Sequence, residues 1–468
     1  MTRLLPILIL AITSFFSSCN DNVTQYADAY FGGEIINPKE KNVILYKDEV
    51  VIDTIPLDNT NRFYYSFEKL EPGLYSFKHD EFQYVYIEPK DSIFLRVNTI
   101  EFDETLTFTG KGALKNNYLI KNFLKNEESK ENLHDAFYNK NPLVFNKQVR
   151  QEQIRRLDYL DRYGDKYNFS SSFLDVAKAN IDYHYYAIKE QYPIYNKKYK
   201  DSIDKENYYL FRQHTDLNKN ELISFYPYYN YLYAVTDNVS KQYKNTPTKS
   251  TNNYLLNYSL NNIHVIDSLI KNPQLKNMVL KRAALNYLTK ADNKIEANVF
   301  LSTYKKISSC KKSCEDLEKM VQTIERLEKG NTIPSFNVIN TKNETINIQK
   351  TITQPTVIYF WTTRYPSHLK GVRKKVAQFA PKSNYNFIGL SIDQDKEVWQ
   401  KVAVKMDSKN EFIFENYKDA TDNLLIHQIH KIFVLDANGK ILNSELNIFD
   451  PKFDEKLSQL QKAELVQQ

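Results

Sequence analysis

Residues 359–368 read Tyr359-Phe360-Trp361-Thr362-Thr363-Arg364-Tyr365-Pro366-Ser367-His368, and the C-terminal sequence can be placed around them. The apolar run 356–361 predicts a buried β-strand that ends at the turn. Pro366 suits the first turn of a helix, where its missing N–H is not needed. Apolar residues then recur at helical spacing, at Leu369, Val372, Val376 and Phe379. The stretch therefore predicts a strand, a turn and a helix.

This strand–turn–helix resembles the active-site edge of the thioredoxin fold, in the TlpA-like branch of envelope thiol-disulfide oxidoreductases. That family carries Phe-Trp-x-x-Trp-Cys-x-x-Cys at this point. Here Phe360 and Trp361 are kept, but Arg364 stands at the second Trp, Tyr365 at the first Cys and His368 at the second Cys. The resemblance therefore implies the scaffold of the family without its pair of thiols.

The sequence after residue 330 extends the resemblance to the end of the chain. We expect strands over 387–392, 431–436 and 440–442, with Asn438-Gly439 as a hairpin turn between the last two. Helices are expected over 396–406 and 451–464. In place of the cis-proline of the family this chain carries His430. Because a cis bond before a residue other than proline costs about 2.5–4 kcal/mol, we expect a trans bond there.

The chemistry of disulfide exchange needs a thiolate that attacks and a second thiol that resolves the mixed disulfide. A tyrosine titrates near 10 when unperturbed and forms no disulfide, and His368 cannot resolve one. We therefore predict a non-catalytic binding or docking cleft for an envelope protein or peptide, without a cofactor. The cleft residues are Trp361, Arg364, Tyr365, His368 and His430. Two alternatives remain open: a thiol-disulfide oxidoreductase or peroxidase, as the family implies, and a structural component of an envelope assembly.

The histidines of the expected cleft offer a further alternative. Imidazoles are common ligands of zinc and copper, and His427 lies three residues before His430. A His-x-x-His pair on a loop is weak evidence for a metal centre, however. We therefore expect no metal and interpret these side chains as ordinary polar residues.

Cys310 and Cys314 lie well before this domain, in the helical part of the chain. Ser313-x-x-Asp316 resembles a capping box, so a helix is expected to start near Cys314. A local disulfide is the favoured interpretation in an oxidising compartment. A redox pair of free thiols and a metal-binding pair are the alternatives.

The first residues have the pattern of a secretory signal. Arg3 supplies a positive charge, and an apolar stretch from Leu4 to Phe16 follows. Ser17-Ser18-Cys19 closes this stretch and resembles a bacterial lipoprotein signal, in which the cysteine carries the lipid. We therefore expect a signal peptide at 1–18 and a lipidated tether at 19–26. The expected location is the outer membrane, facing the periplasm or the cell surface.

The remaining chain divides by its patterns into three parts, which predicts a multidomain α+β protein. Short strands separated by turns over 27–112 suggest an antiparallel, sandwich-like domain. This part also resembles a domain of unknown function that is common in envelope lipoproteins. Helical periodicity fills 113–329, and the thioredoxin-like domain is expected over 330–468. The net charge of +6, with 63 basic and 57 acidic residues interspersed, gives no sign of nucleic-acid binding.

Two clusters of tyrosines, at 183–186 and 226–233, stand out in the helical part. Exposed tyrosines can stack on carbohydrate, but tyrosines at this spacing more often pack between helices with the hydroxyl at the edge. We therefore predict that both clusters are packed in the helical core.

Overall fold

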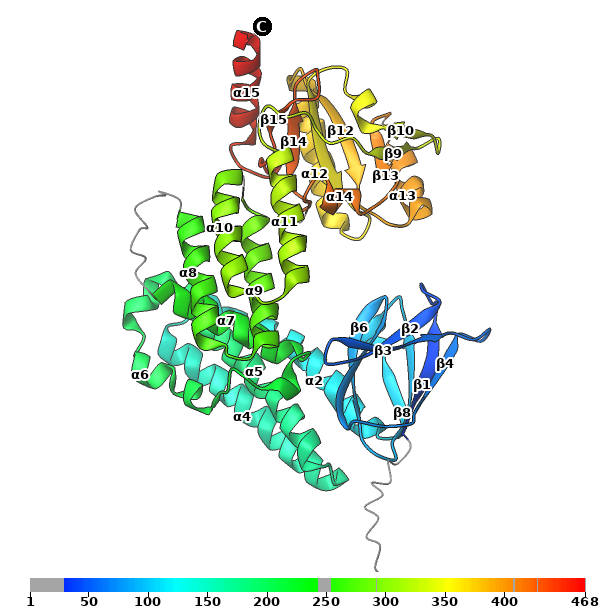
Figure 1. Ribbon diagram of the computed structural model, residues 1–468, viewed down its shortest axis with the longest axis vertical. Coiled ribbons are helices and arrows are strands. Elements are labelled where there is room, and N and C mark those ends of the chain that lie inside the picture. Colours follow the sequence, from blue (N-terminus) through cyan, green and yellow to red (C-terminus); the bar gives the residue numbers. More distant parts are fainter. Residues whose placement is uncertain (1–28, 243–253, 292, 407–408, 427, 468) are drawn as a thin grey trace, which may run out of the picture. The chain divides into compact units, whose positions relative to one another are not determined.

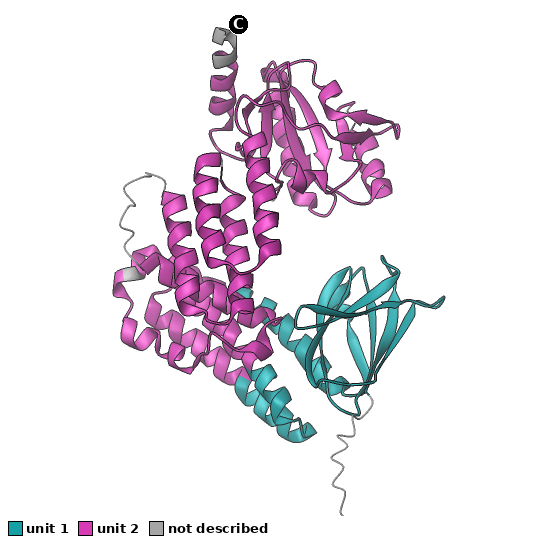
Figure 2. Ribbon diagram, viewed as in Figure 1, with its two compact units in different colours: residues 1–132, 157–178 teal, residues 133–156, 179–468 magenta. Residues whose placement is uncertain are grey.

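The computed structural model describes residues 29–242, 254–291, 293–406, 409–426 and 428–467. The predicted signal peptide, the predicted tether with Cys19, and His427 lie outside the described residues. The chain folds into two compact units, residues 1–132 with 157–178 and residues 133–156 with 179–468 (Figure 2). These units cut across the predicted domain boundaries, because the helices between 113 and 329 are shared between them.

The first unit contains a β-sandwich of two four-stranded sheets (Figure 1). One sheet has the order β4-β1-β7-β8, with β4 (Arg62–Phe67), β1 (Ala29–Ile36), β7 (Ser92–Asn98) and β8 (Thr107–Lys111). The other has the order β3-β2-β5-β6, with β3 (Val50–Pro56), β2 (Asn42–Lys47), β5 (Gly73–His79) and β6 (Glu81–Ile87). Side chains from both sheets share one core, in which Phe31 contacts Phe63 and Phe77 at ring distances of 5.3 and 5.5 Å.

The predicted β domain is present, and all of its described strand pairs but one are antiparallel. β1 pairs with β7 in parallel, from Tyr30 opposite Ser92 to Ile36 opposite Asn98. Two strands joined by a tight turn must be antiparallel, but β1 and β7 are separated by five other strands and are free of that constraint. The short helix α1 (Phe102–Thr105) lies between β7 and β8, and the long helix α2 (Ala113–Asn132) follows the sandwich.

The helical region runs from α2 to α11 and has the helical periodicity that the sequence predicts. Its remaining helices are α3 (His134–Asn139), α4 (Pro142–Tyr167), α5 (Ser171–Tyr195), α6 (Lys205–Tyr208), α7 (Tyr226–Gln242), α8 (Tyr254–Leu269), α9 (Pro273–Leu288), α10 (Lys294–Ile307) and α11 (Lys311–Arg326). In the described part of the chain, none of the helices combines the length and apolar character needed to cross a bilayer.

Most tyrosines of the two clusters are packed as predicted, whereas Tyr226 is 54% exposed. Tyr183, Tyr185, Tyr228 and Tyr231 are all buried, and the Tyr183 ring lies 4.8 Å from the Tyr228 ring and 5.3 Å from the Tyr231 ring. Burial raises the pKa of Tyr183 to about 12. These rings fill the helical core and present no surface to a ligand.

The C-terminal part is a seven-stranded sheet with the order β10-β9-β13-β12-β11-β14-β15 (Figure 1). Its strands are β9 (Asn337–Asn340), β10 (Thr345–Asn347), β11 (Thr356–Trp361), β12 (Asn386–Ser391), β13 (Glu411–Phe414), β14 (Ile432–Leu435) and β15 (Ile441–Asn443). β11 is parallel to β12 and antiparallel to β14. The prediction that 356–361 lies inside a sheet beside 387–392 is therefore confirmed.

The helices of this part are α12 (Pro366–Phe379), α13 (Lys396–Ala403), α14 (Asp419–Asp422) and α15 (Phe453–Gln467). Every residue of β11 is buried, as expected for a central strand covered on both faces. One core cluster joins Val357 and Trp361 of β11 to Phe379 of α12, Trp399 of α13 and Phe453 of α15. The carboxyl end of β11 and the start of α12 are thereby fixed in place.

Candidate functional site

The turn between β11 and α12 is held by a buried carboxylate, Asp393, which follows β12. The Thr363 backbone N–H donates to its two oxygens at 3.1 and 2.9 Å, and the Ser391 hydroxyl donates at 2.8 Å. The Thr362 hydroxyl donates to Asp393 as well. Only 4% of Asp393 is exposed, so these bonds are charge-assisted and little weakened by water. They fix the backbone that leads into the predicted site.

Trp361 is fully buried, so its predicted place among the ligand-facing residues of the cleft is wrong. Its side chain points to β13, where the indole N–H donates to a carboxyl oxygen of Glu411 at 2.8 Å. The Tyr359 hydroxyl donates to the other oxygen. Burial raises the pKa of Glu411, while the two hydrogen bonds act in the opposite direction. Trp361 is buried because the last residue of a central strand points into the core below the turn.

Arg364 and Tyr365 lie on the exposed turn, where the resemblance places them. Tyr365 is the N-cap residue of α12 and is 60% exposed, and Pro366 occupies the first turn as predicted. The Arg364 backbone N–H donates to the Thr362 hydroxyl at 3.2 Å, and Arg364 is exposed. Arg364 and Tyr365 thus place a cation and an aromatic ring on consecutive exposed residues at the start of α12.

His368 lies one turn into α12 and is half-buried. Both ring nitrogens are buried and have no hydrogen-bond partner among the described residues. The ring lies edge-on to Phe449, with 5.5 Å between centroids. Burial lowers the pKa of His368, and the nearby His430 lowers it further. The lowered pKa favours the neutral imidazole, in which one nitrogen can donate and the other can accept a hydrogen bond.

His430 precedes β14 and is half-buried. One ring nitrogen lies 3.1 Å from the Gln428 side-chain oxygen, and the backbone carbonyl accepts the Ile448 N–H at 3.1 Å. The bond before His430 is trans, as predicted. The structure thus brings His368 and His430 into one neighbourhood. In the described part of the chain, no group of three or more His, Cys, Asp or Glu side chains is arranged to hold a metal ion.

The predicted disulfide between Cys310 and Cys314 is absent, and both cysteines are free thiols. The helix α11 begins at Lys311 rather than near Cys314, and Cys310 is its N-cap residue. Cys310 therefore has extended backbone outside the helix, whereas Cys314 lies within the first turns. The Ser313 hydroxyl donates to the Cys310 sulfur at 3.3 Å.

The Cys310 thiol is more acidic than an ordinary cysteine thiol. Its pKa is lowered, first by the Ser313 hydroxyl and backbone N–H and then by the charge of Lys281. A thiolate at the start of a helix is the reactive form of cysteine in exchange reactions. These thiols lie outside the C-terminal sheet, in the helical region.

Sequence reasoning did not find Asp393 and Glu411, which position the site. Asp393 directly follows a buried strand, and Glu411 opens a short apolar run. A charged residue at the edge of an apolar segment was the only feature of the sequence that could have drawn attention to either carboxylate. Apart from Ser391, however, the hydrogen-bond partners of these two carboxylates lie 30 to 52 residues away along the chain.

Comparison with known proteins identifies the C-terminal domain. A family model described as thioredoxin-like matches residues 353–441. That match spans β11, α12, β12 and β14, which carry the site described above. The C-terminal domain is therefore thioredoxin-like. No curated protein matches this chain.

Solved structures resemble the same part of the chain. The thioredoxin domain of a thiol-disulfide oxidoreductase from Bacteroides vulgatus is 22% identical, with 29% of this chain and 98% of that chain covered and a TM-score of 0.24. A thiol:disulfide interchange protein from Bacteroides sp. is also 22% identical, with 29% and 90% covered and a TM-score of 0.24. At this level of similarity, neither neighbour says what this chain does.

Proposed function

We propose that the thioredoxin-like domain of this chain is a binding module for an envelope protein or peptide and works without thiol chemistry. The observation that supports this best is His368, whose buried ring nitrogens have no partner among the described residues. Buried polar groups in folded proteins nearly always have hydrogen bonds. A neutral imidazole needs one acceptor and one donor, and an extended peptide backbone offers both.

The residues in front of His368 favour a protein partner. Arg364 and Tyr365 are exposed on the turn that Asp393 holds. Tyrosine and arginine are over-represented among the residues that contribute most to protein–protein binding. An exposed guanidinium also favours an acidic side chain on the partner.

The proposal includes a lipid anchor at Cys19, because Ser17-Ser18-Cys19 closes an apolar segment. Cys19→Ala is expected to abolish lipid labelling and release the protein from membranes, since one modified cysteine would carry the anchor. Metabolic labelling with a fatty acid and membrane fractionation measure both effects. A Cys19→Ala protein that still carries lipid would place the anchor elsewhere.

The binding proposal predicts that Arg364→Ala combined with Tyr365→Ala lowers partner binding by roughly tenfold or more, as expected for residues of these types at the centre of an interface. Proteins captured from envelope extract by the full chain are identified first, and the affinity of each is then measured with purified protein. Tyr417→Ala is the matched control, because Tyr417 is an exposed tyrosine of the same domain outside the turn.

The control variant is expected to bind like the unmodified protein. Equal affinity of the double variant and the unmodified protein for every captured partner would contradict the proposal. The unmodified protein is also expected to reduce insulin disulfides no faster than background. Tyr365→Cys with His368→Cys tests whether the start of α12 still activates a thiol.

A second candidate function is thiol-disulfide exchange by Cys310 and Cys314. The free state of both thiols and the lowered pKa of Cys310 favour it. Insulin reduction by the unmodified protein that disappears in Cys310→Ser or Cys314→Ser would replace the binding proposal with this one.

A further inference from the structure

A cavity of about 540 Å³ opens in the helical region, apart from the thioredoxin-like domain. Its lining comes from the end of α5 and the segment after it, from the C-terminal turns of α7, and from the first turns of α8. This volume lies in the roughly 300–1,000 Å³ range of small-molecule sites. The proposed function does not use this cavity.

Three polar side chains, Tyr209, Asn238 and Gln242, lie together in the lining. The amide nitrogens of Asn238 and Gln242 both donate to the Tyr209 hydroxyl oxygen at 3.1 Å. Gln242 also donates to the Asn238 side-chain oxygen at 3.1 Å. Because the Tyr209 oxygen accepts two bonds, its own hydrogen stays available to donate. The Gln242 side-chain oxygen accepts from no described residue, so a donor and an acceptor lie next to each other.

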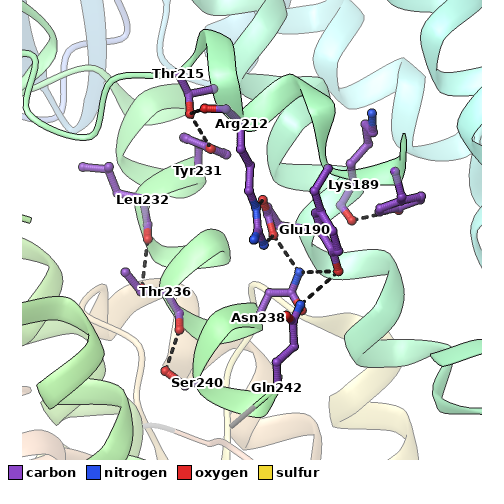
Figure 3. A network of polar contacts seen from close by, with 12 residues as sticks. Lys189, Glu190, Arg212, Thr215, Tyr231, Leu232, Thr236, Asn238, Ser240 and Gln242 are labelled. Atoms are coloured by element: carbon purple, nitrogen blue, oxygen red, sulfur yellow. Dashed lines mark hydrogen bonds and ion pairs between the residues drawn. The ribbon is translucent and has the colours of Figure 1, made fainter. Parts of the chain in front are cut away.

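A buried ion pair orients the polar group of Tyr209, Asn238 and Gln242. Glu190 is fully buried, and the Arg212 guanidinium donates to its two oxygens at 2.7 and 2.6 Å (Figure 3). Asn238, which is only 2% exposed, donates to the same carboxylate at 2.6 Å. The Arg212 guanidinium also stacks on the Tyr209 ring at 4.0 Å. The amide and the phenol are thereby held in one orientation before any ligand arrives.

The wall formed by α8 is aromatic. Tyr254 and Tyr258 both line the cavity, and their rings are nearly parallel, with 6.5 Å between centroids and 13° between planes. Tyr254 is 71% exposed, unlike the packed tyrosines of the helical core. Tyr258 is half-buried, and the Lys241 ammonium lies 5.2 Å from its ring centroid. The two parallel rings present flat apolar surface with polar edges, which suits a ligand that has an apolar face and polar substituents.

The charged residues of the lining are all basic. They are Lys197, Lys205 and Lys241, and no carboxylate is found among the described residues of the lining. Lys241 forms an ion pair with Asp237 at 3.1 Å. Lys197 and Lys205 are exposed and form no ion pair with a described residue. The entrance is therefore positive, whereas the polar group of Tyr209, Asn238 and Gln242 is neutral.

We infer that this cavity binds a sugar ring that carries a carboxylate or a phosphate group. A sugar hydroxyl both donates and accepts, so it pairs with the Tyr209 hydroxyl and the Gln242 oxygen together. The C–H face of the ring packs on Tyr258. The anionic group lies toward Lys197 and Lys205, which attract either a carboxylate or a phosphate.

Isothermal titration calorimetry of the full chain with glucuronate and with glucose 6-phosphate tests this inference. Saturable binding of at least one is expected, and the preferred one identifies the anionic group. Tyr258→Ala is expected to weaken binding about tenfold, because the stacking face is lost. Tyr209→Phe removes one hydroxyl and is expected to weaken it about threefold to tenfold. Lys197→Gln combined with Lys205→Gln is expected to weaken binding by a similar factor, and this loss of affinity should become smaller as salt is added.

Matched controls separate the cavity from general effects on the fold. Tyr226→Ala removes an exposed tyrosine of α7 and Lys306→Gln removes an exposed lysine of α10, neither in the lining. Both are expected to bind the acidic sugar normally. Absence of saturable binding for both acidic sugars would overturn the inference. So would inorganic phosphate or neutral glucose binding as tightly as the acidic sugars, or full binding by correctly folded Tyr258→Ala protein.

Discussion

Replacing Arg212 with alanine is expected to destabilise the helical region by about 3–5 kcal/mol, near the lower end of that range. Among the described residues, three side-chain hydrogen bonds reach the Glu190 carboxylate, and Arg212 supplies two of them (Figure 3). Glu190 is fully buried, so its charge would be left with the Asn238 amide alone. The Arg212 side chain is 27% exposed. Because water can enter after its removal and solvate the carboxylate, we expect a loss of stability near the lower end of that range. Urea denaturation followed by far-UV circular dichroism measures the change.

The double variant Glu190→Gln with Arg212→Ala shows whether an unpaired charge is the cause. Removing the carboxylate charge together with the cation is expected to recover more than half of the lost stability, since no buried charge remains. The stability of the charge-conserving Arg212→Lys protein should lie between those of the unmodified protein and Arg212→Ala. An ammonium group keeps the charge but cannot form the two parallel hydrogen bonds of a guanidinium. An Arg212→Ala protein as stable as the unmodified one would show that the pair contributes nothing net.

Periodicity and turn residues predicted strands in the sandwich and in the C-terminal sheet, but β1 is one of the strands that they did not locate. Gly32 and Gly33 lie within it, and glycine is unfavourable in strand interiors. The structure requires both glycines, because a Cβ on Gly32 would lie 2.8 Å from the Phe63 carbonyl oxygen and one on Gly33 would lie 2.5 Å from that of Leu95. Close packing between neighbouring strands, which the sequence does not display, overrides the local preference here.

The candidate site was predictable only in part, for a similar reason. The resemblance fixed the positions of Tyr365, His368 and His430, because these depend on order along the chain. The hydrogen bond that orients the buried Trp361 indole depends instead on Glu411, which lies 50 residues later on a strand that periodicity did not reveal. At α11 the capping pattern was misleading, since Ser313 turns its hydroxyl to the Cys310 sulfur and the helix begins earlier.

Gly389→Ala is expected to destabilise the thioredoxin-like domain by about 2–5 kcal/mol, the sum of overpacking and a disrupted buried hydrogen bond. Gly389 lies in β12, between β11 and β13. A Cβ there would lie 2.1 Å from a Glu411 carboxyl oxygen and 2.8 Å from the Tyr359 hydroxyl. The carboxyl would have to move away from Tyr359 and Trp361, at a place where only 3% of Glu411 is exposed. Urea denaturation followed by tryptophan fluorescence measures the change.

Gly371→Ala is the matched control, because a Cβ there meets only the flexible side chain of Phe449, at 3.1 Å. It lies within α12, where alanine is more favourable than glycine by about 1 kcal/mol, so a neutral or stabilising effect is expected. A double-mutant cycle with Glu411→Ala then tests the cause. That substitution removes the atoms that the new methyl group would meet, so Gly389→Ala should cost at least about 1 kcal/mol less in its presence. Strictly additive effects would mean that Gly389 is required by the strand backbone and not by the buried carboxyl group beside Trp361.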